Sequence, residues 1–178
     1  MKPKIVIIGG GGHGKVVCDA IIDQDQFEIL GFVDVDEKLE SIVTRNFKVI
    51  ESQNNLNKLV DKASHFIVAI GNNKIRENIY NKAALYLKPA TIIHPTAIIG
   101  FNVTINDGSV VLSNSVINNS TIIGKNCIIN AGTIIDHDCK IGNGVHLSIG
   151  TKVGSTSSVA DYYTSSIGQC IPSFSSIM

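Results

Sequence analysis

Two histidines in the second half of the sequence have neighbours that suit proton transfer. His137 lies between Asp136 and Asp138, and His146 follows nine residues later. An imidazole titrates near neutral pH, and a neighbouring carboxylate orients its ring and favours the imidazolium. The pattern is compatible with proton transfer by these histidines and equally with a pair of surface histidines on a solvated face. A metal site is disfavoured, because no third ligand recurs with the two histidines.

A glycine-rich segment near the N-terminus could bind phosphate. Residues 9–14 read G-x-G-x-x-G between an expected strand over 4–8 and an expected helix over 15–22. Asp34 follows twenty residues after Gly14, at the end of a second expected strand. This arrangement matches the dinucleotide fingerprint, in which amides at a helix N-terminus bind the diphosphate and an acidic side chain binds the ribose.

The length of the first half argues for a smaller ligand than a dinucleotide. A dinucleotide site needs two βαβαβ halves, and only about ninety residues precede the repeats of the second half. One half suits one nucleotide, with its phosphates on the amides of the glycine-rich segment. We therefore favour a nucleotide or nucleotide-sugar ligand, with NAD and a purely structural turn as the alternatives.

Further side chains of the first half could contribute to the same site. His13 and Lys15 could help to neutralise a phosphate, and Asp34 could bind a ribose or a base edge. Gly71 begins a loop at the carboxyl end of another expected strand, with Arg76 close behind it, and ligands gather at that edge of a parallel sheet. The alternatives are a solvated lysine, a turn residue at a strand end and a helix cap.

The elements expected in the first half alternate along the chain, which is typical of a parallel α/β sheet. Apolar runs predict strands over 4–8, 27–33, 47–50 and 65–70, and helical spacing predicts helices over 15–22, 54–60 and 73–87. A half-Rossmann βαβαβ domain over residues 1–90 accounts for this order.

The second half follows a period of six residues. An aliphatic residue occupies every sixth position: Ile93, Ile99, Ile105, Val111, Ile117, Ile123, Ile129, Ile135, Ile141, Leu147, Val153 and Val159. The residue after it is often Gly or Asn, which tolerate strained turn angles, and the fourth residue after it is usually small. The pattern predicts a left-handed parallel β-helix of hexapeptide repeats over residues 91–178, with three repeats per coil and about four coils.

The repeat is expected to fail near the C-terminus. Ser165 occupies the next aliphatic position, and a Ser-rich stretch follows it to Met178. We expect an interrupted coil there and an apparently shortened C-terminus, because a solenoid needs a polar cap at its end.

Composition excludes several classes of protein. Fifteen basic residues balance fifteen acidic ones, which argues against nucleic-acid binding. No apolar run approaches the roughly 20 residues of a membrane span, and the apolar run after Met1 is too short for a signal peptide. The four cysteines lack zinc spacing. These observations predict a cytoplasmic protein with reduced thiols and no membrane insertion.

Four segments carry a resemblance to a known family: residues 11–14, 32–34, 69–76, and 136–138 together with His146. With the repeats, they resemble the bacterial sugar acyltransferases that include sialic-acid O-acetyltransferases and UDP-4-amino-sugar N-acetyltransferases of bacillosamine-type pathways. The resemblance covers residues 3–172.

The resemblance implies an acetyl-CoA-dependent homotrimer that acetylates the amino group of a UDP-sugar. It implies that His137 is the general base, that Asp138 raises its basicity, and that His146 and Ile167 contact acetyl-CoA in a cleft between neighbouring β-helices. The residues implied in UDP-sugar binding are Gly11, Gly12, His13, Asp34, Val35 and Gly71.

Two alternatives to this function are kept. One is O-acetylation of a sugar hydroxyl, as in the sialic-acid branch. The other is a non-catalytic nucleotide-sugar-binding or scaffold protein, because family members usually continue for a further coil beyond the end of this sequence.

Overall fold

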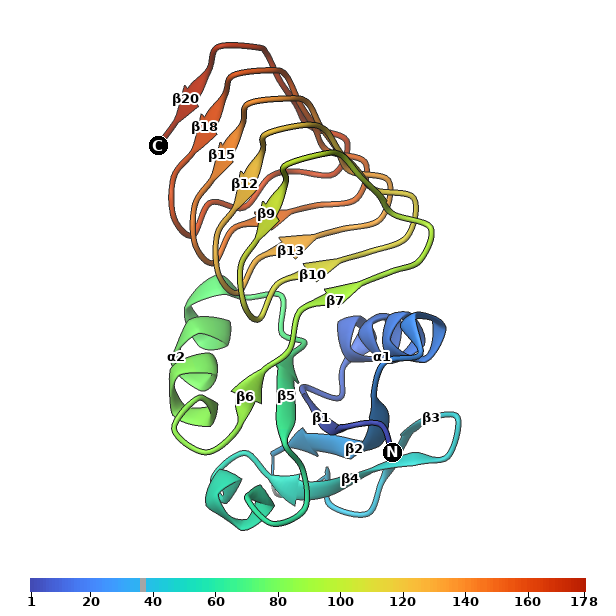
Figure 1. Ribbon diagram of the computed structural model, residues 1–178. Coiled ribbons are helices and arrows are strands. Elements are labelled where there is room, and N and C mark those ends of the chain that lie inside the picture. The colour runs from blue at the N-terminus through green and yellow to red at the C-terminus, as the bar shows by residue number, and fades with distance from the viewer. Residues whose placement is uncertain (36–37) are drawn as a thin grey trace. The chain divides into compact units, whose positions relative to one another are not determined.

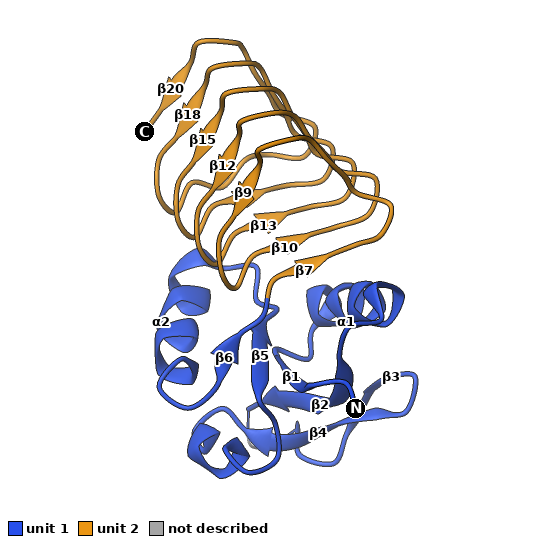
Figure 2. Cartoon of the chain, viewed as in Figure 1, with its two compact units in different colours: residues 1–90 blue, residues 91–178 orange. Residues whose placement is uncertain are grey.

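The computed structural model describes residues 1–35 and 38–178 (Figure 1). The chain forms two compact units, Met1–Ala90 and Thr91–Met178 (Figure 2). The first is a Rossmann-like α/β unit and the second is a parallel β-helix, so the predicted fold class is confirmed.

Unit 1 is built on one six-stranded sheet with the strand order β3-β4-β2-β1-β5-β6. Its elements are β1 (Lys4–Ile8), α1 (Gly12–Gln24), β2 (Glu28–Asp34), β3 (Ile42–Thr44), β4 (Phe47–Ser52), the 3-10 helix η2 (Leu56–Leu59), β5 (His65–Val68), α2 (Asn73–Ala83) and β6 (Lys88–Pro89). All neighbouring strands pair in parallel except β3 and β4, which form an antiparallel hairpin. The carboxyl ends of β1, β2, β4 and β5 therefore meet at one edge of the sheet.

Alternation along β1 divides the core of unit 1 between the two faces of the sheet. Val6 and Ile8 pack in one cluster with η2 and α2, which contribute Leu56 and Ile79 among others. Ile5 and Ile7 are also fully buried, and α1 packs against β1 and β2. This packing fixes the strand ends from which the loops of the candidate site emerge.

Two sequence expectations for unit 1 need correction. The helix expected over 54–60 is only the short 3-10 helix Leu56–Leu59, and the helix expected to reach residue 87 ends at Ala83. The short strands β3 and β6 were not predicted. Hairpins and two-residue edge strands leave little periodic signal, because pairing with a neighbour rather than local pattern defines them.

Unit 2 is a prism with three parallel sheets, one on each side (Figure 1). The first contains β7 (Ile92–Ile93), β10 (Val110–Val111), β13 (Ile128–Ile129) and β16 (His146–Leu147). The second contains β8 (Ile98–Ile99), β11 (Val116–Ile117), β14 (Ile134–Ile135), β17 (Lys152–Val153) and β19 (Cys170–Ile171). The third contains β9 (Thr104–Ile105), β12 (Ile122–Ile123), β15 (Lys140–Ile141), β18 (Ser158–Val159) and β20 (Ser176–Ile177).

The aliphatic residues of the six-residue period form the core of the prism. Residues from Val111 to Val159 in this register are at most 3% exposed and pack in one cluster. Strand partners such as Ile117 and Ile135 lie 18 residues apart, so three repeats make one coil, as predicted.

The expectation of an interrupted end with about four coils is wrong. β19 and β20 pair with β17 and β18, so the stacking continues through a fifth coil. Ser165 takes the inward position of that coil and is 3% exposed. Its hydroxyl accepts a hydrogen bond from the Ser148 amide at 2.8 Å and lies 2.7 Å from the Thr151 hydroxyl. These bonds satisfy a polar group at a position that is otherwise aliphatic.

The strained turn angles occur two residues later than predicted. Left-handed φ values recur at every sixth residue: Asn102, Gly108, Asn114, Ser120, Asn126, Gly132, Asp138, Gly144, Gly150, Thr156, Tyr162, Gly168 and Phe174. The glycines directly after the aliphatic residues have another cause. A Cβ at Gly124 would lie 2.4 Å from the Gly142 carbonyl oxygen, so glycine there permits close stacking of the coils.

Candidate functional site

The glycines after β1 divide into those that the fold needs and those that leave open space. Gly9 has φ +112°, and a Cβ at Gly14 would lie 2.0 Å from the Gly9 carbonyl oxygen. A Cβ at Gly11 or Gly12 would meet nothing within 4 Å among the described residues. Gly12 begins α1, so its amide is one of the helix N-terminal donors. The open side of this turn can therefore accept an anion on its backbone amides.

Asp34 ends β2 and binds the glycine-rich segment. Its Oδ2 accepts hydrogen bonds from the Gly10 amide at 2.8 Å and from Lys38 Nζ at 3.2 Å, and its Oδ1 accepts one from the Val35 amide at 2.8 Å. Burial opposes ionisation of this carboxyl, but these donors hold its pKa below its usual range. The Asp34 carboxyl thus ties the glycine segment to the end of β2.

The loop after β5 carries Gly71 at the same edge of the sheet. Arg76 is 1% exposed, and its Nη1 donates to the carbonyl oxygens of Ile70 and Gly71 at 3.0 and 3.1 Å. Its Nη2 donates to Asn73 Oδ1 at 2.8 Å. Arg76 therefore holds the shape of the Gly71 loop from inside the unit.

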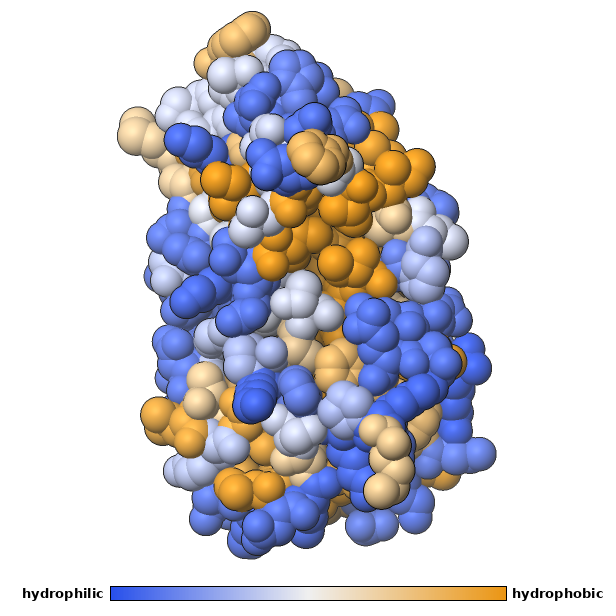
Figure 3. All heavy atoms as spheres, in the orientation of Figure 1, coloured by the Kyte–Doolittle hydropathy of each residue, from blue (hydrophilic) through white to orange (hydrophobic). Residues whose placement is uncertain are grey.

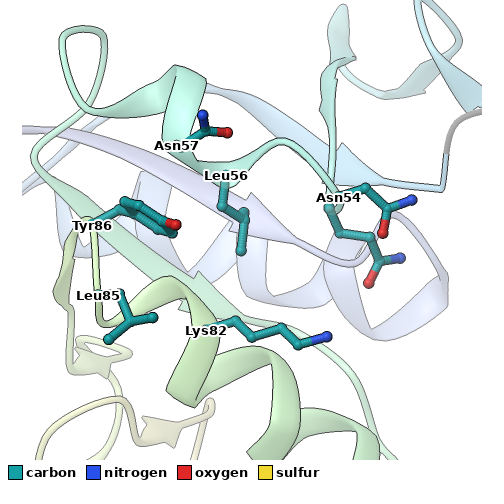
Figure 4. Close-up of a pocket in the computed structure, with 7 residues that line it drawn as sticks. Asn54, Leu56, Asn57, Lys82, Leu85 and Tyr86 are labelled. Carbon is teal, nitrogen blue, oxygen red and sulfur yellow. The ribbon is translucent and has the colours of Figure 1, made fainter.

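Unit 1 also contains a hollow of about 270 Å³ on the side of η2 and the last turn of α2 (Figure 4). Its lining residues are Gln53, Asn54, Leu56, Asn57, Lys82, Leu85 and Tyr86. The Gln53 amide donates to the Asp34 carbonyl oxygen at 2.8 Å, so one end of the lining adjoins the edge that carries Asp34. Sequence reasoning gave no signal for this hollow, because its residues lie in a short 3-10 helix and a helix end.

His137 stands on the corner of the β-helix between β14 and β15. Its Nδ1 lies 2.8 Å from Asp138 Oδ2, and the two side chains are 53% and 59% exposed. The hydrogen bond with Asp138, followed by the nearby charges of Asp136 and Asp138, raises the pKa of His137 above its usual value. Since Nδ1 faces the carboxylate, Nε2 is the nitrogen available to take a proton from a ligand.

A groove of about 510 Å³ runs beside this corner along the second sheet. Its lining residues are Asn118, Ile134, Asp136, Lys152, Val153, Gly154, Cys170, Ile171, Pro172 and Ser173. The groove begins beside the residue that precedes His137 and continues over the last two coils. Sequence reasoning did not predict Lys152 or Cys170 as lining residues, because residues 18 apart meet here only through the stacking of coils.

His146 and Ile167 lie on other parts of the same unit. His146 is half-buried on β16, in the first sheet, and Ile167 is 76% exposed in the turn before β19. His137 follows β14 of the second sheet. The two predicted active-site histidines thus occupy different sides of the prism within one chain.

Apolar side chains gather on part of the β-helix surface that faces the viewer in Figure 3. Strand pairing, which that view does not label, places Ile98, Val116 and Ile134 in register at outward positions of the second sheet, on β8, β11 and β14. Ile98 is 63% exposed and Ile134 is 40% exposed. Such a ladder is larger than scattered surface apolar residues and is typical of a contact surface.

Among residues 1–35 and 38–178, no helix has the length and apolar character to cross a membrane. The same residues contain no group of three or more His, Cys, Asp or Glu side chains that could hold a metal ion.

Comparisons with known proteins match both units. Residues 4–83 match the family described as the PglD N-terminal domain. A curated relative, UDP-N-acetylbacillosamine N-acetyltransferase of Bacillus subtilis (strain 168), is 29% identical over 121 residues. That alignment covers 61% of this chain, and the chain spans about half (51%) of the relative's length.

Two solved structures are similar over nearly the whole chain. A mutant of perosamine N-acetyltransferase from Caulobacter crescentus, in complex with CoA and GDP-perosamine, has a TM-score of 0.78 and 26% identity over 98% of this chain and 88% of that one. The acetyltransferase domain of PglB from Neisseria gonorrhoeae, in complex with acetyl coenzyme A, has a TM-score of 0.60 and 30% identity. It covers 99% of this chain, which spans 88% of that domain.

Proposed function

Because this chain belongs to the bacterial sugar acetyltransferases that carry hexapeptide repeats, we propose that it transfers the acetyl group of acetyl-CoA to the amino group of a UDP-linked amino sugar. The observation that carries the proposal is the 2.8 Å contact between His137 Nδ1 and Asp138 Oδ2 on an exposed corner beside a groove. This pair supplies the proton acceptor that amine acylation needs.

His137 is the general base of the proposed reaction. Nδ1–H of His137 donates a hydrogen bond to Asp138, which leaves Nε2 free of a proton. Nε2 accepts a proton from the sugar amine while the amine nitrogen forms a bond to the thioester carbonyl carbon. The tetrahedral oxyanion then collapses, the carbon–sulfur bond breaks, and the coenzyme thiolate takes the proton from the imidazolium. Asp138 stabilises the imidazolium during these steps, as the raised pKa of His137 supports.

The UDP-sugar binds at the carboxyl edge of the sheet in unit 1. Gly11 and Gly12 leave open space for the diphosphate to approach their backbone, and His13 follows Gly12 in the first turn of α1. Asp34, Val35 and Gly71 surround the same edge. The hydrogen bond that Asp34 accepts from Gly10 supports a role for Asp34 in holding the glycine segment in the shape that binds the diphosphate, in addition to any contact with the ligand.

Acetyl-CoA lies between neighbouring copies of the β-helix in the proposed homotrimer. The placement of His137 and His146 on different sheets supports a site to which two copies contribute, with His146 and Ile167 contacting the coenzyme. The apolar ladder of Ile98, Val116 and Ile134 provides a surface for a second copy.

The test is an assay of the purified protein with acetyl-CoA and a panel of UDP-linked amino sugars. We expect release of free thiol together with a gain of one acetyl group on one sugar, and a product stable to mild base, as an amide is and an ester is not. Matched sugars that carry a hydroxyl in place of the amine are the control. Turnover of the hydroxyl sugar alone would overturn N-acetylation, and tight UDP-sugar binding without any turnover would overturn the enzymatic function.

A further inference from the structure

Asp136, which precedes His137, holds the corner of the β-helix on which His137 stands. Asp136 Oδ1 accepts a hydrogen bond from the backbone amide of His137 at 2.8 Å. The same oxygen accepts a second hydrogen bond, at 3.1 Å, from the side-chain amide of Asn118. Asn118 belongs to the preceding coil, 18 residues earlier, where it follows β11. The side chain of one coil is therefore linked to the backbone of His137 in the next.

One residue of each coil directly follows the second-sheet strand, and of these five stacked residues only Asn118 and Asp136 have polar side chains. From the first coil to the last they are Gly100, Asn118, Asp136, Gly154 and Pro172. A Cβ at Gly100 would lie 2.7 Å from the Asn119 amide nitrogen, and one at Gly154 would lie 2.4 Å from the Ser173 amide nitrogen. Glycine thus lies on both sides of the Asn118–Asp136 pair, and the Asp136 member of the pair belongs to the coil that carries His137.

Other bonds from the preceding coil complete the support of the corner. Thr121 Oγ1 donates to the Asp136 carbonyl oxygen at 2.8 Å and accepts from the Cys139 amide at 3.2 Å. The Asp138 amide donates to the Asn119 carbonyl oxygen at 3.0 Å. Links of these kinds recur along the prism. A second side-chain amide, that of Asn143, lies 3.5 Å from the Asp161 carboxylate at another corner, so the Asn118 link is the shorter of the two and the one at the corner of His137.

We propose that Asn118 is a positioning residue for the base His137, acting through the carboxylate of Asp136. The proposal rests on the proposed function of His137. By holding Asp136 Oδ1 against the His137 amide, Asn118 limits the motion of the corner and keeps a negative charge beside the ring. The hydrogen bond from the His137 amide, followed by that from Asn118, holds the pKa of Asp136 below its usual range, so this carboxyl is ionised when His137 titrates.

The charged groups around His137 are few. Asp136 and Asp138 belong to its own corner, and the adjoining positions of the coils below and above are Asn119 and Ser155, which are uncharged. Lys140 on β15 and Lys152 on β17 are the cations of the neighbouring strands. Among the residues that the structure describes, the carboxylate of Asp136 is one of two anions that act on the ring.

The first test is a double-mutant cycle on kcat with Asn118→Ala, Asp136→Ala and the combined variant. Asn118→Ala should lower kcat by about 2- to 10-fold, the range that one hydrogen bond supports, and leave KM for the UDP-sugar unchanged. In the Asp136→Ala background the same change should alter kcat by less than about twofold, because its partner is gone. Additive effects in the two backgrounds, or an unchanged kcat in Asn118→Ala, would overturn the proposal.

The second test does not depend on turnover. Hydrogen exchange of the His137 backbone amide, followed by NMR, should become about 2- to 10-fold faster in Asn118→Ala. Asn106→Ala is the matched control, since Asn106 occupies the equivalent position of another corner and donates to the Ile123 carbonyl oxygen at 2.7 Å. It should leave exchange at His137 unchanged. Unchanged exchange in Asn118→Ala would refute the link itself, whereas faster exchange in a protein without turnover would refute only the proposed function.

Discussion

Replacement of His137 by alanine is the most direct test of the proposed mechanism. A positioned base contributes about 10²- to 10⁴-fold to a proton-transfer step, so His137→Ala should lower kcat by about that factor. The side chain is 53% exposed and stands on a corner outside the core, so the fold should be unaffected. UDP-sugar affinity should also stay unchanged, because the open glycine segment belongs to the other unit.

The pH dependence of the same reaction identifies the base. His137 must be neutral to accept a proton, so kcat/KM should fall as the pH drops through its pKa. The hydrogen bond with Asp138 raises that pKa above the ordinary value of 6.5, so this limb of the profile should lie above pH 6.5. Asp138→Asn removes the charge that raises the pKa, so the limb should move to lower pH and kcat should fall by less than in His137→Ala.

The assay is thiol release from acetyl-CoA at saturating UDP-sugar, measured between pH 5 and 9. His94→Ala serves as a control, since His94 is another histidine of unit 2 and hydrogen-bonds locally to Thr96. The reasoning is refuted if His137→Ala retains near-full activity with its oligomeric state intact. It is also refuted if the acidic limb persists unchanged in that variant, because another group would then titrate.

Four further results are expected from the same structure. Gly12→Val should abolish UDP binding in calorimetry and leave the melting temperature unchanged. Gly14→Ala should lower the melting temperature, because its Cβ would lie 2.0 Å from the Gly9 carbonyl oxygen. NAD binding by the unmodified protein without UDP binding would contradict the assignment of a UDP site. A thiol reagent should label Cys170, the exposed cysteine, ahead of the buried Cys18, Cys127 and Cys139, and acetyl-CoA should protect it if the coenzyme fills the groove. Ser165→Ala should destabilise the protein by about 1–3 kcal/mol in denaturant unfolding, since the Ser148 amide loses its acceptor, whereas the exposed Ser166→Ala should be neutral. Light scattering should give about three times 19.0 kDa, and a monomer at micromolar concentration would contradict a site shared between copies.

The β-helix was predictable from the sequence because an aliphatic residue recurs at every sixth position and has the same role in every repeat. One aliphatic residue in six must point to the axis of the prism, so the pattern from Ile93 to Val159 follows directly from the packing. The pattern misled at Ser165, because a buried hydroxyl there is satisfied by Ser148 and Thr151 in the adjoining coil. Hydrogen bonds between residues that are distant in sequence carry no periodic signal.

The candidate site was predictable where its contacts are local. His137 and Asp138 are adjacent, and a left-handed corner brings their side chains to 2.8 Å. The hydrogen bond from the Gly10 amide to Asp34 was not predictable. The dinucleotide fingerprint identifies Asp34, but it does not say which of its carboxylate oxygens accepts a hydrogen bond from the protein rather than from a ligand. The role of Asn118 was hidden for the same reason, because its partner lies 18 residues away.

Asp138 meets two demands that few residues satisfy together. Its φ of +58° belongs to the left-handed region, which Gly, Asn and Asp adopt most readily, although the equivalent corners of this prism also carry Thr156 and Tyr162. Its carboxylate must also reach His137 Nδ1 from the next position along the chain. Glycine would keep the backbone and lose the contact, whereas asparagine keeps the backbone, the size and a hydrogen-bonding oxygen but removes the negative charge. Asp138→Asn therefore separates the contribution of the carboxylate from the conformational contribution of this residue, and a shift of the acidic limb in that variant measures the effect of the carboxylate, through its hydrogen bond and its charge, on the pKa of His137.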